Sequence, residues 1–466
     1  MKRSQKHPLD KGADLLARVA RGLAVVSLLA AAVTVLLLSC VPVKAHAQGV
    51  ASQDATASLP PDEAVAEALQ RAPAWRAALA RHQAERARGA AAVANPNDWT
   101  PSASWARRNA RGDAATPGEL TTREWSVGLS RGLRMPAKAE AAAAAGQGQQ
   151  ARADAQLAWA WHELMRTWLD DALAVLQAAR QEQLLAAQFR LWEQQHQAAE
   201  RRHALGDAAR QELVLLDAGR AQAQAQWLQA QQRWLTAQGV WRNRYPGLSL
   251  PQADGPAAGA EGALALAAPN SDADAQAVRD AREAAWVDAH PQWRLARLEA
   301  EAAQAQARLT EAERHPDPTV GVQVGRERSG AERILGVNVS WPLGSAARSL
   351  QSQAQWAEAQ AARAQEDDMR RALQGNFAQW RAEWIAGQQV WQSAERAQAQ
   401  ARLAAQAVRK GYELGEGALS EVLLLQRQWL DLQQVAATAE LEALRARWRW
   451  LLETGSRWAW APEAAR

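Results

Sequence analysis

Six histidines follow residue 47, and their spacing decides whether the sequence predicts a metal or catalytic site. His162 precedes Glu163, but the second histidine that a zinc-protease helix requires is missing. His196 and His203 lie about two helical turns apart, too far for one chain to bind one ion with both, and we expect both to be solvated. No Ser/His/Asp or Cys/His arrangement is detectable. The sequence therefore predicts no enzyme, no cofactor and no metal site.

Carboxylates recur at matched positions in two segments, 203–217 and 412–426, which are offset by 209 residues. The matched residues are Leu205, Gly206, Asp207 and Glu212 in the first segment and Leu414, Gly415, Glu416 and Glu421 in the second. A second match pairs Pro73 and Trp75 with Pro291 and Trp293. An internal repeat of two copies is the interpretation that these matches favour.

The repeat predicts the organisation of the chain. We expect a signal peptide (1–47), a first repeat (48–244), a linker rich in Pro, Gly and Ala (245–274), a second repeat (275–453) and a C-terminal tail (454–466).

The basic charge of the chain is concentrated at its N-terminus. The formal net charge is +4, but residues 1–47 hold seven of the 54 bases and two of the 50 acids. The rest of the chain is thus nearly neutral, which gives no indication of a nucleic-acid partner. An apolar run over 22–43 followed by Ala45 and Ala47 predicts cleavage before Gln48. An uncleaved membrane anchor and a lipoprotein with Cys40 acylated are the alternatives.

Long helices are the strongest local prediction. Residues 137–204 and 346–413 contain no proline and consist mainly of good helix formers, so that each helix would span roughly 100 Å as part of a coiled coil. Leu205-Gly206 and Leu414-Gly415 end these helices, since glycine readily adopts the left-handed conformation at a helix end. Shorter helices are expected over 62–93, 208–243, 275–314 and 418–453.

Between the helices, each copy contains two short segments in which apolar and polar or small residues alternate. The alternation is clear over 125–133, 319–325 and 335–341 and weaker over 102–105. One apolar face is typical of a transmembrane β-strand, although a soluble hairpin is the alternative. Trp105, Trp125 and Trp341 are expected near strand ends, as in an aromatic belt. Four strands cannot close a barrel, so membrane insertion would require several copies of the chain.

Together these features resemble the TolC family of outer-membrane efflux proteins over residues 60–453. The segment from Arg409 to Gly415, followed by Glu421-Val422-Leu423, is the most specific stretch. The segment LGEGALSEVLLLQRQ is most similar to the heavy-metal (CzcC-like) branch of that family. The resemblance implies a mainly α fold of long coiled-coil helices with four strands per chain, completing a 12-stranded barrel as a homotrimer.

The resemblance also implies a location, partners and site residues. The protein would be an outer-membrane channel of a Gram-negative bacterium, in contact with outer-membrane lipid, a periplasmic adaptor protein and an inner-membrane pump of RND or ABC type. Leu205, Gly206, Leu414 and Gly415 would lie in the turns that dock the adaptor. Glu421, Glu212, Asp207 and Glu416 would surround the periplasmic entrance, where converging carboxylates favour cations.

Two alternatives remain open at this point. Glu212 and Glu421 each lie in the first turn of a returning helix, so that they could serve as helix-capping residues rather than as a gate. The chain as a whole could be a periplasmic coiled-coil scaffold without a pore, but the alternating strands favour the channel.

Overall fold

The computed structural model describes residues 59–94, 96–111, 119–252 and 272–458. The description below concerns the unit formed by residues 55–466. The expected signal peptide and Cys40, much of the linker and the end of the C-terminal tail lie outside the described residues.

The elements follow one another in the same order in both copies: short helices, two strands, a long helix and a returning helix. The helices are α2 (Asp62–Arg71), α3 (Pro73–Val93), α4 (Pro136–Ala204), α5 (Arg210–Arg244), α7 (Asp272–Ala289), α8 (Pro291–Ala312), α9 (Ala346–Glu413) and α10 (Leu419–Glu453). The strands are β1 (Trp99–Arg111), β2 (Glu119–Gly132), β3 (Thr319–Glu327) and β4 (Glu332–Ser340), with a short 3-10 turn η1 (Arg328–Gly330) between the last two. The mainly α fold class with four strands is confirmed.

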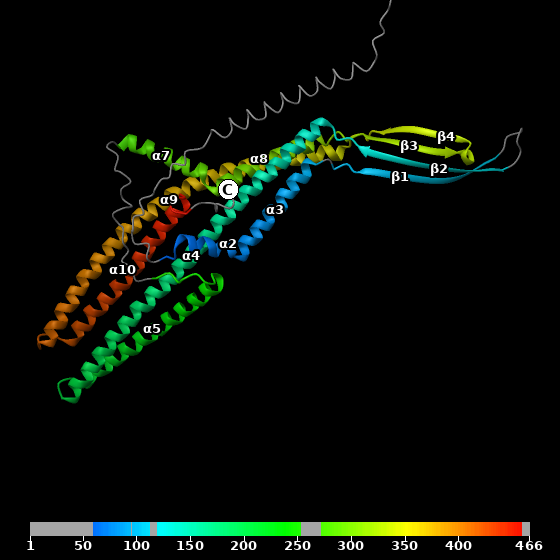
Figure 1. The fold of residues 1–466 in the computed structure, drawn as a ribbon. Coiled ribbons are helices and arrows are strands. Elements are labelled where there is room, and N and C mark those ends of the chain that lie inside the picture. The colour runs from blue at the N-terminus through cyan, green and yellow to red at the C-terminus, as the bar shows by residue number, and fades with distance from the viewer. Residues whose placement is uncertain (1–58, 95, 112–118, 253–271, 459–466) are drawn as a thin grey trace, which may run out of the picture. The chain divides into compact units, whose positions relative to one another are not determined.

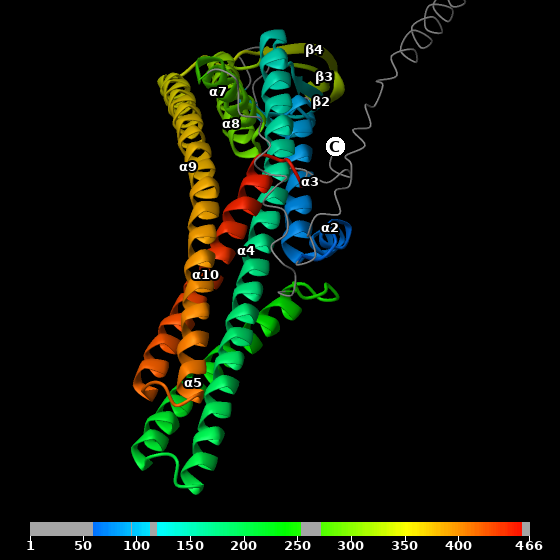
Figure 2. The same ribbon diagram turned by 90° about the vertical axis from the view of Figure 1, so that its left-hand side faces the viewer.

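Helices α4 and α9 are 69 and 68 residues long, as their lack of internal proline predicts. Each is followed by an antiparallel partner of 35 residues, α5 or α10. Helix α3 packs on α4, and α8 packs between α4 and α9. Within unit 55–466 the strands lie at one end of the long helices and the turns before α5 and α10 lie at the other (Figure 1; Figure 2).

The helices predicted over 62–93 and 275–314 are each broken in two, contrary to expectation. Ala72 and His290 have extended ψ angles of 139° and 132°, and each precedes the proline that begins the next helix. A residue before proline is disfavoured in the helical conformation because the proline ring collides with it. Pro73 and Pro291 then serve as first-turn residues, where no N–H is needed.

The four strands form one antiparallel sheet in the order β1-β2-β3-β4. The hairpin β1–β2 belongs to the first copy and β3–β4 to the second, and β2 pairs with β3 to join the copies. Contrary to expectation, Trp105 and Trp125 lie in the middle of their strands, directly opposite each other. The strands extend beyond them with polar residues such as Arg107 and Arg123.

Aromatic and leucine side chains fill the core where the shorter helices meet the long helices α4 and α9. One buried cluster includes Trp75, Trp161, Trp168, Trp241 and Trp448, and a second one includes Trp293, Phe377, Trp380 and Trp450. Three tryptophans of α5 are spaced by seven residues: Trp241 lies in the core, whereas Trp227 and Trp234 are only half-buried. Among the described residues, the helices lack the combination of length and apolar character needed to cross a bilayer.

Candidate functional site

One face of the sheet is apolar and exposed. Because residues opposite each other in antiparallel strands share a face, the register defines rows across all four strands. Two such rows are Ala103–Val127–Val324–Leu335 and Pro101–Leu129–Val322–Val337. In the isolated chain the exposed fractions of Leu335 and Val337 are 81% and 72%. An exposed apolar face of this extent marks a surface that another molecule or a membrane covers.

The opposite face is polar and carries small side chains. One of its rows is Ser102–Gly128–Gln323–Gly336. On the same face, Ser104 and Ser126 form a hydrogen bond of 2.8 Å between their hydroxyl oxygens. The sheet is therefore amphipathic across its whole width.

Aromatic residues mark both limits of the apolar face. Trp99 begins β1, Trp341 follows β4, and the pair Trp105–Trp125 lies six residues further along the strands. At about 3.3 Å per residue these limits are ~20 Å apart. The apolar band of a membrane barrel is about 25 Å tall, so that the dimension fits a bilayer.

An ion pair between a buried lysine and a half-buried aspartate fixes the sheet to the long helix α4. Lys138, at the start of α4, lies 2.8 Å from the carboxylate of Asp317, which precedes β3. The same carboxylate accepts a hydrogen bond of 3.2 Å from the backbone N–H of Met135. Burial opposes ionisation of Asp317, but these contacts outweigh it and lower its pKa.

The turns at the far end of the helices are built alike in both copies. Tip 1 comprises residues 203–212 and tip 2 comprises residues 412–421. Gly206 and Gly415 have φ angles of +85° and +86°, as predicted for helix-ending glycines. In tip 1 the backbone N–H of Gly206 donates to the carbonyl of His203 and that of Asp207 to the carbonyl of Arg202; tip 2 repeats both bonds. This pattern is a Schellman motif, which satisfies the last carbonyls of each long helix.

Glu212 of tip 1 and Arg202, just before that tip, contact Tyr412 of tip 2. The Glu212 carboxylate accepts hydrogen bonds from the Arg202 guanidinium and, at 2.8 Å, from the Tyr412 hydroxyl. The Arg202 guanidinium also lies over the Tyr412 ring, 5.0 Å from its centre. Burial and the bond to Glu212 raise the pKa of Tyr412 despite the opposing charge of Arg202. Glu212 thus contacts both halves of the repeat.

The other predicted tip residues are exposed. Asp207, Glu416 and Glu421 face solvent, and no ion pair of these acids is found among the described residues. Leu205 and Leu414, at the ends of the long helices, are 77% and 71% exposed. The structure brings Glu212 close to tip 2, whereas it leaves Glu421 on the exposed surface of the isolated chain.

A cluster of ionisable side chains is buried where the two copies meet. His162 of α4 and His290, the residue before α8, both lie next to Glu453, the last residue of α10. Burial by itself raises the pKa of Glu453, but the hydrogen bonds from the two histidines outweigh it and lower the pKa to about 2. Burial also lowers the pKa of His290.

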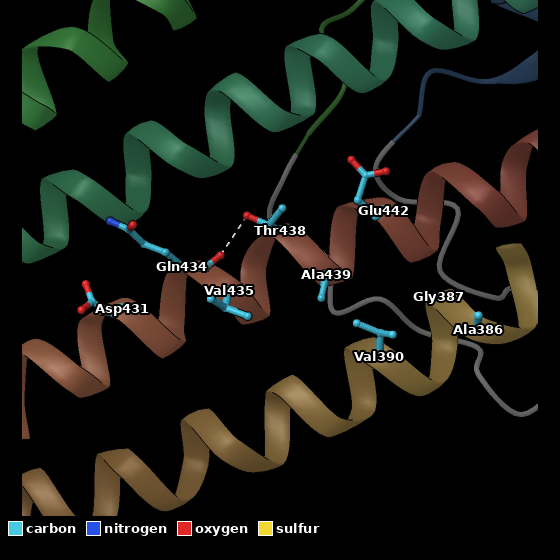
Figure 3. A pocket seen from close by; sticks show the side chains of 9 residues that line it. All are labelled: Ala386, Gly387, Val390, Asp431, Gln434, Val435, Thr438, Ala439 and Glu442. Carbon is cyan, nitrogen blue, oxygen red and sulfur yellow. Dashed lines mark hydrogen bonds between the residues drawn. The ribbon is translucent and has the colours of Figure 1, made fainter.

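An open groove of about 740 Å³ lies between α9 and α10 (Figure 3). Small and aliphatic side chains line most of it, including Val390 and Val435, while Asp431 and Glu442 lie toward its two ends. Glu442 is paired with Arg445 at 3.1 Å. The groove offers a surface on which a further helix could pack rather than a set of groups for catalysis.

Two of these groupings were not foreseen from the sequence. Arg202 and Tyr412 contact Glu212 only because α4 and α9 end side by side. Tyr412 and Glu212 are 200 residues apart in the sequence. His162 and Glu453 are separated by 291 residues. His290 had a usable signal, since it occupies the position before proline that Ala72 occupies in the first copy.

Solved structures provide the comparison for this fold. The outer-membrane channel OprN is similar over 86% of this chain and 90% of its own length, with a TM-score of 0.69 and 19% identity. VceC from Vibrio cholerae is similar over 84% of this chain and 95% of its own length, with a TM-score of 0.64 and 17% identity. CusC, a transmembrane channel, has a TM-score of 0.65 at 15% identity over 84% of this chain and 91% of its own. No protein-family model and no curated protein matches the sequence.

These similarities define the class of fold. The chain has the fold of outer-membrane channels built from long helices and a small antiparallel sheet. In its fold it is similar to OprN, VceC and CusC in particular, and the resemblance to the fold of the TolC family is confirmed.

Proposed function

We propose that this chain is the outer-membrane exit duct of a tripartite efflux system. In this proposal, three chains combine their sheets of four strands into one barrel, and the long helices continue it as a tunnel through the periplasm of a Gram-negative bacterium. The duct conducts passively, because the energy for export comes from the inner-membrane pump.

The exposed apolar face of the sheet is the observation that carries this proposal. Among the described residues, β1 and β4 each pair along one edge, so that the other edge of each is available to a neighbouring chain. In lipid an unpaired backbone group costs several kcal/mol, and closure into a barrel removes that cost. The polar face then lines water and the apolar face contacts lipid.

The tips provide the second part of the proposal. Exposed Leu205 and Leu414, with Gly206 and Gly415 setting the turns, form the docking surface for a periplasmic adaptor protein. Glu421, with Asp207 and Glu416, faces the periplasmic entrance and favours cations there. Glu212, which is engaged by Arg202 and Tyr412, holds the two tips of one chain together.

We also propose which substrate is exported and which type of pump works with the duct. The segment LGEGALSEVLLLQRQ, at residues 414–428, supports a duct of the heavy-metal branch working with an RND-type pump. Drug export by an RND pump is the second possibility. Co-purification of the tagged chain with its adaptor, followed by export assays with metal ions and with drugs, distinguishes the two.

Oligomeric state and conductance test the duct itself. The protein extracted from outer membranes with detergent should crosslink as a trimer, appear by electron microscopy as a ring with a long stem, and conduct ions in planar bilayers. A periplasmic scaffold would instead be released by osmotic shock as a water-soluble chain and would conduct nothing. That result would overturn the proposal.

A further inference from the structure

The cluster of His162, His290 and Glu453 has the chemistry of a metal site. The Nε2 atoms of His162 and His290 lie 3.1 and 3.2 Å from the same carboxylate oxygen of Glu453, Oε2. All three ligand atoms lie within 4.8 Å of one another. Imidazole nitrogen and carboxylate oxygen are donors that Zn²⁺ accepts at about 2.0–2.2 Å, so that a small inward movement of each side chain would suffice to bind it.

From this convergence we propose that His162, His290 and Glu453 bind one divalent transition-metal ion of the zinc class as a structural site. The proposal is independent of the efflux function, because the site lies within a single chain. It assigns an ion that stays with the protein rather than one that passes through it.

Burial and charge support a resident cation. The exposed fraction of each of the three side chains is 1% or less. The site holds one carboxylate, and the Arg166 guanidinium, which lies 3.7 Å from its Oε1 atom, also pairs with Glu163. A metal ion would balance this buried negative charge at much shorter distance.

Two buried atoms of the cluster have no hydrogen-bond partner among the described residues: Oε1 of Glu453 and Nδ1 of His162. Oε1 can supply a fourth ligand if the carboxylate binds the ion through both oxygens. Three residues would then supply four donor atoms, which is the coordination number of structural zinc sites. Nδ1 of His162 can carry the ring proton while Nε2 binds the ion.

Metal binding must change the protonated ring nitrogen of His290 and one of its hydrogen bonds. Its Nδ1 accepts a hydrogen bond of 3.3 Å from the backbone N–H of Gln292, so that its ring proton lies on Nε2. Ligation through Nε2 moves that proton to Nδ1 and gives up this long hydrogen bond. The bonds to the ion must compensate for it, and the first turn of α8 should become less protected from hydrogen exchange when the metal binds.

The ion would connect the two copies of the repeat. His162 belongs to the long helix of the first copy, whereas His290 and Glu453 come from the start of α8 and the end of α10 in the second. The second buried cluster adjoins it, since the centre of the His290 ring lies 6.0 Å from that of the Phe377 ring, and Trp161 of the first cluster directly precedes His162. A bound ion therefore fixes the junction where the two hydrophobic cores meet.

Metal analysis of the whole purified protein tests the proposal. The protein in detergent is treated with a chelator, dialysed and given Zn²⁺, and the bound metal is measured after gel filtration. We expect one zinc per chain and a higher thermal-unfolding midpoint than for the chelated protein. Glu453→Gln and His162→Gln should each weaken Zn²⁺ binding at least tenfold and abolish the zinc-dependent rise in the midpoint.

His82→Gln is the matched control. His82 also contacts a carboxylate, that of Asp154 at 2.6 Å, but no third ligand lies beside this pair among the described residues, and the loss of His82 should leave zinc binding unchanged. Should the cluster variants fail to fold, Co²⁺ added to the chelated wild-type protein should give the visible absorption of a four-coordinate site. A wild-type protein that binds no Zn²⁺ and shows no Co²⁺ absorption would overturn the proposal and leave a hydrogen-bonded cluster. Equal binding by the folded cluster variants would overturn it as well.

Discussion

At the residue scale, the contact between the two tips depends on a single carboxylate. Glu212 accepts hydrogen bonds from Arg202 of its own copy and from Tyr412 of the other copy. The matching position in the second copy, Glu421, does not have these neighbours, because Gly411 stands where the first copy has Arg202. The tips are therefore joined asymmetrically, although their backbones follow the same motif.

Tyr412→Phe tests whether this contact keeps the entrance narrow. Removing the hydroxyl leaves the ring in place but deletes a hydrogen bond to a charged acceptor, worth about 1.5–3 kcal/mol. We expect a several-fold higher basal conductance in planar bilayers, together with a modest fall in the thermal-unfolding midpoint.

Tyr245→Phe is the control, since Tyr245 is the other tyrosine of the chain and its hydroxyl donates to the Asp171 carboxylate at the same distance, 2.8 Å. It lies after α5, away from the tips. Equal conductance in the two variants would show that the Tyr412 contact does not restrict the entrance.

At the element scale, the position of α3 against α4 depends on two glycines. A Cβ atom at Gly146 of α4 would lie 2.5 Å from the carbonyl oxygen of Gly89 in α3, and a Cβ at Gly89 would lie 2.8 Å from the carbonyl oxygen of Gly146. Both obstacles are backbone atoms, so that no side-chain rotation can relieve the collision. Gly146 is therefore a helix-packing residue, because its missing side chain lets α3 lie close to α4.

Gly146→Ala should destabilise the protein by about 1–3 kcal/mol, because the added methyl group overpacks this crossing. Gly239→Ala is the matched control: this helical glycine of α5 lies next to open space, and a methyl group there would meet no atom within 4 Å beyond its own stretch of helix. The control should be stabilised by about 0.5–1 kcal/mol through helix propensity. Thermal unfolding followed by circular dichroism measures both effects, and equal midpoints would contradict the close helix contact.

The elements themselves were predictable because their signals are local. Proline-free runs of good helix formers defined α4 and α9, and alternation defined β3 and β4. The breaks before Pro73 and Pro291 were missed because a long run of helix formers surrounds each proline, although proline does restrict the residue before it. The contacts of Glu212 and of the buried cluster could not be predicted, since they depend on which helices lie side by side.

At the scale of the whole molecule, the sheet is the part that a single chain leaves incomplete. Its apolar face stands exposed, and each outer strand offers an unpaired edge among the described residues. The helices also leave apolar side chains such as Leu235, Ile385 and Leu403 exposed, so that both the sheet and the helices offer surfaces to neighbouring chains.

A comparison of the variants Val337→Lys and Asn338→Lys tests which face of the sheet contacts lipid. The two residues are neighbours on β4, and the register places Val337 on the apolar face and Asn338 on the polar one. A lysine near the middle of the lipid-facing surface of a barrel costs about 2–4 kcal/mol. We expect the Val337 variant to be depleted from the outer-membrane fraction and to lose its crosslinked trimer, whereas the Asn338 variant keeps both. Equal membrane assembly of the two variants would contradict a lipid-facing apolar surface.

The number of strands in each chain has a consequence for how copies can join. Because there are four in the described part of the chain, alternating in direction, β1 and β4 run in opposite senses. An even count means that β4 of one copy meets β1 of the next in antiparallel orientation at every seam of a ring. A chain that lost one strand would have an odd count, and every seam would become parallel. Such a deletion would therefore disrupt the whole ring and not only the hydrogen bonds of the missing strand.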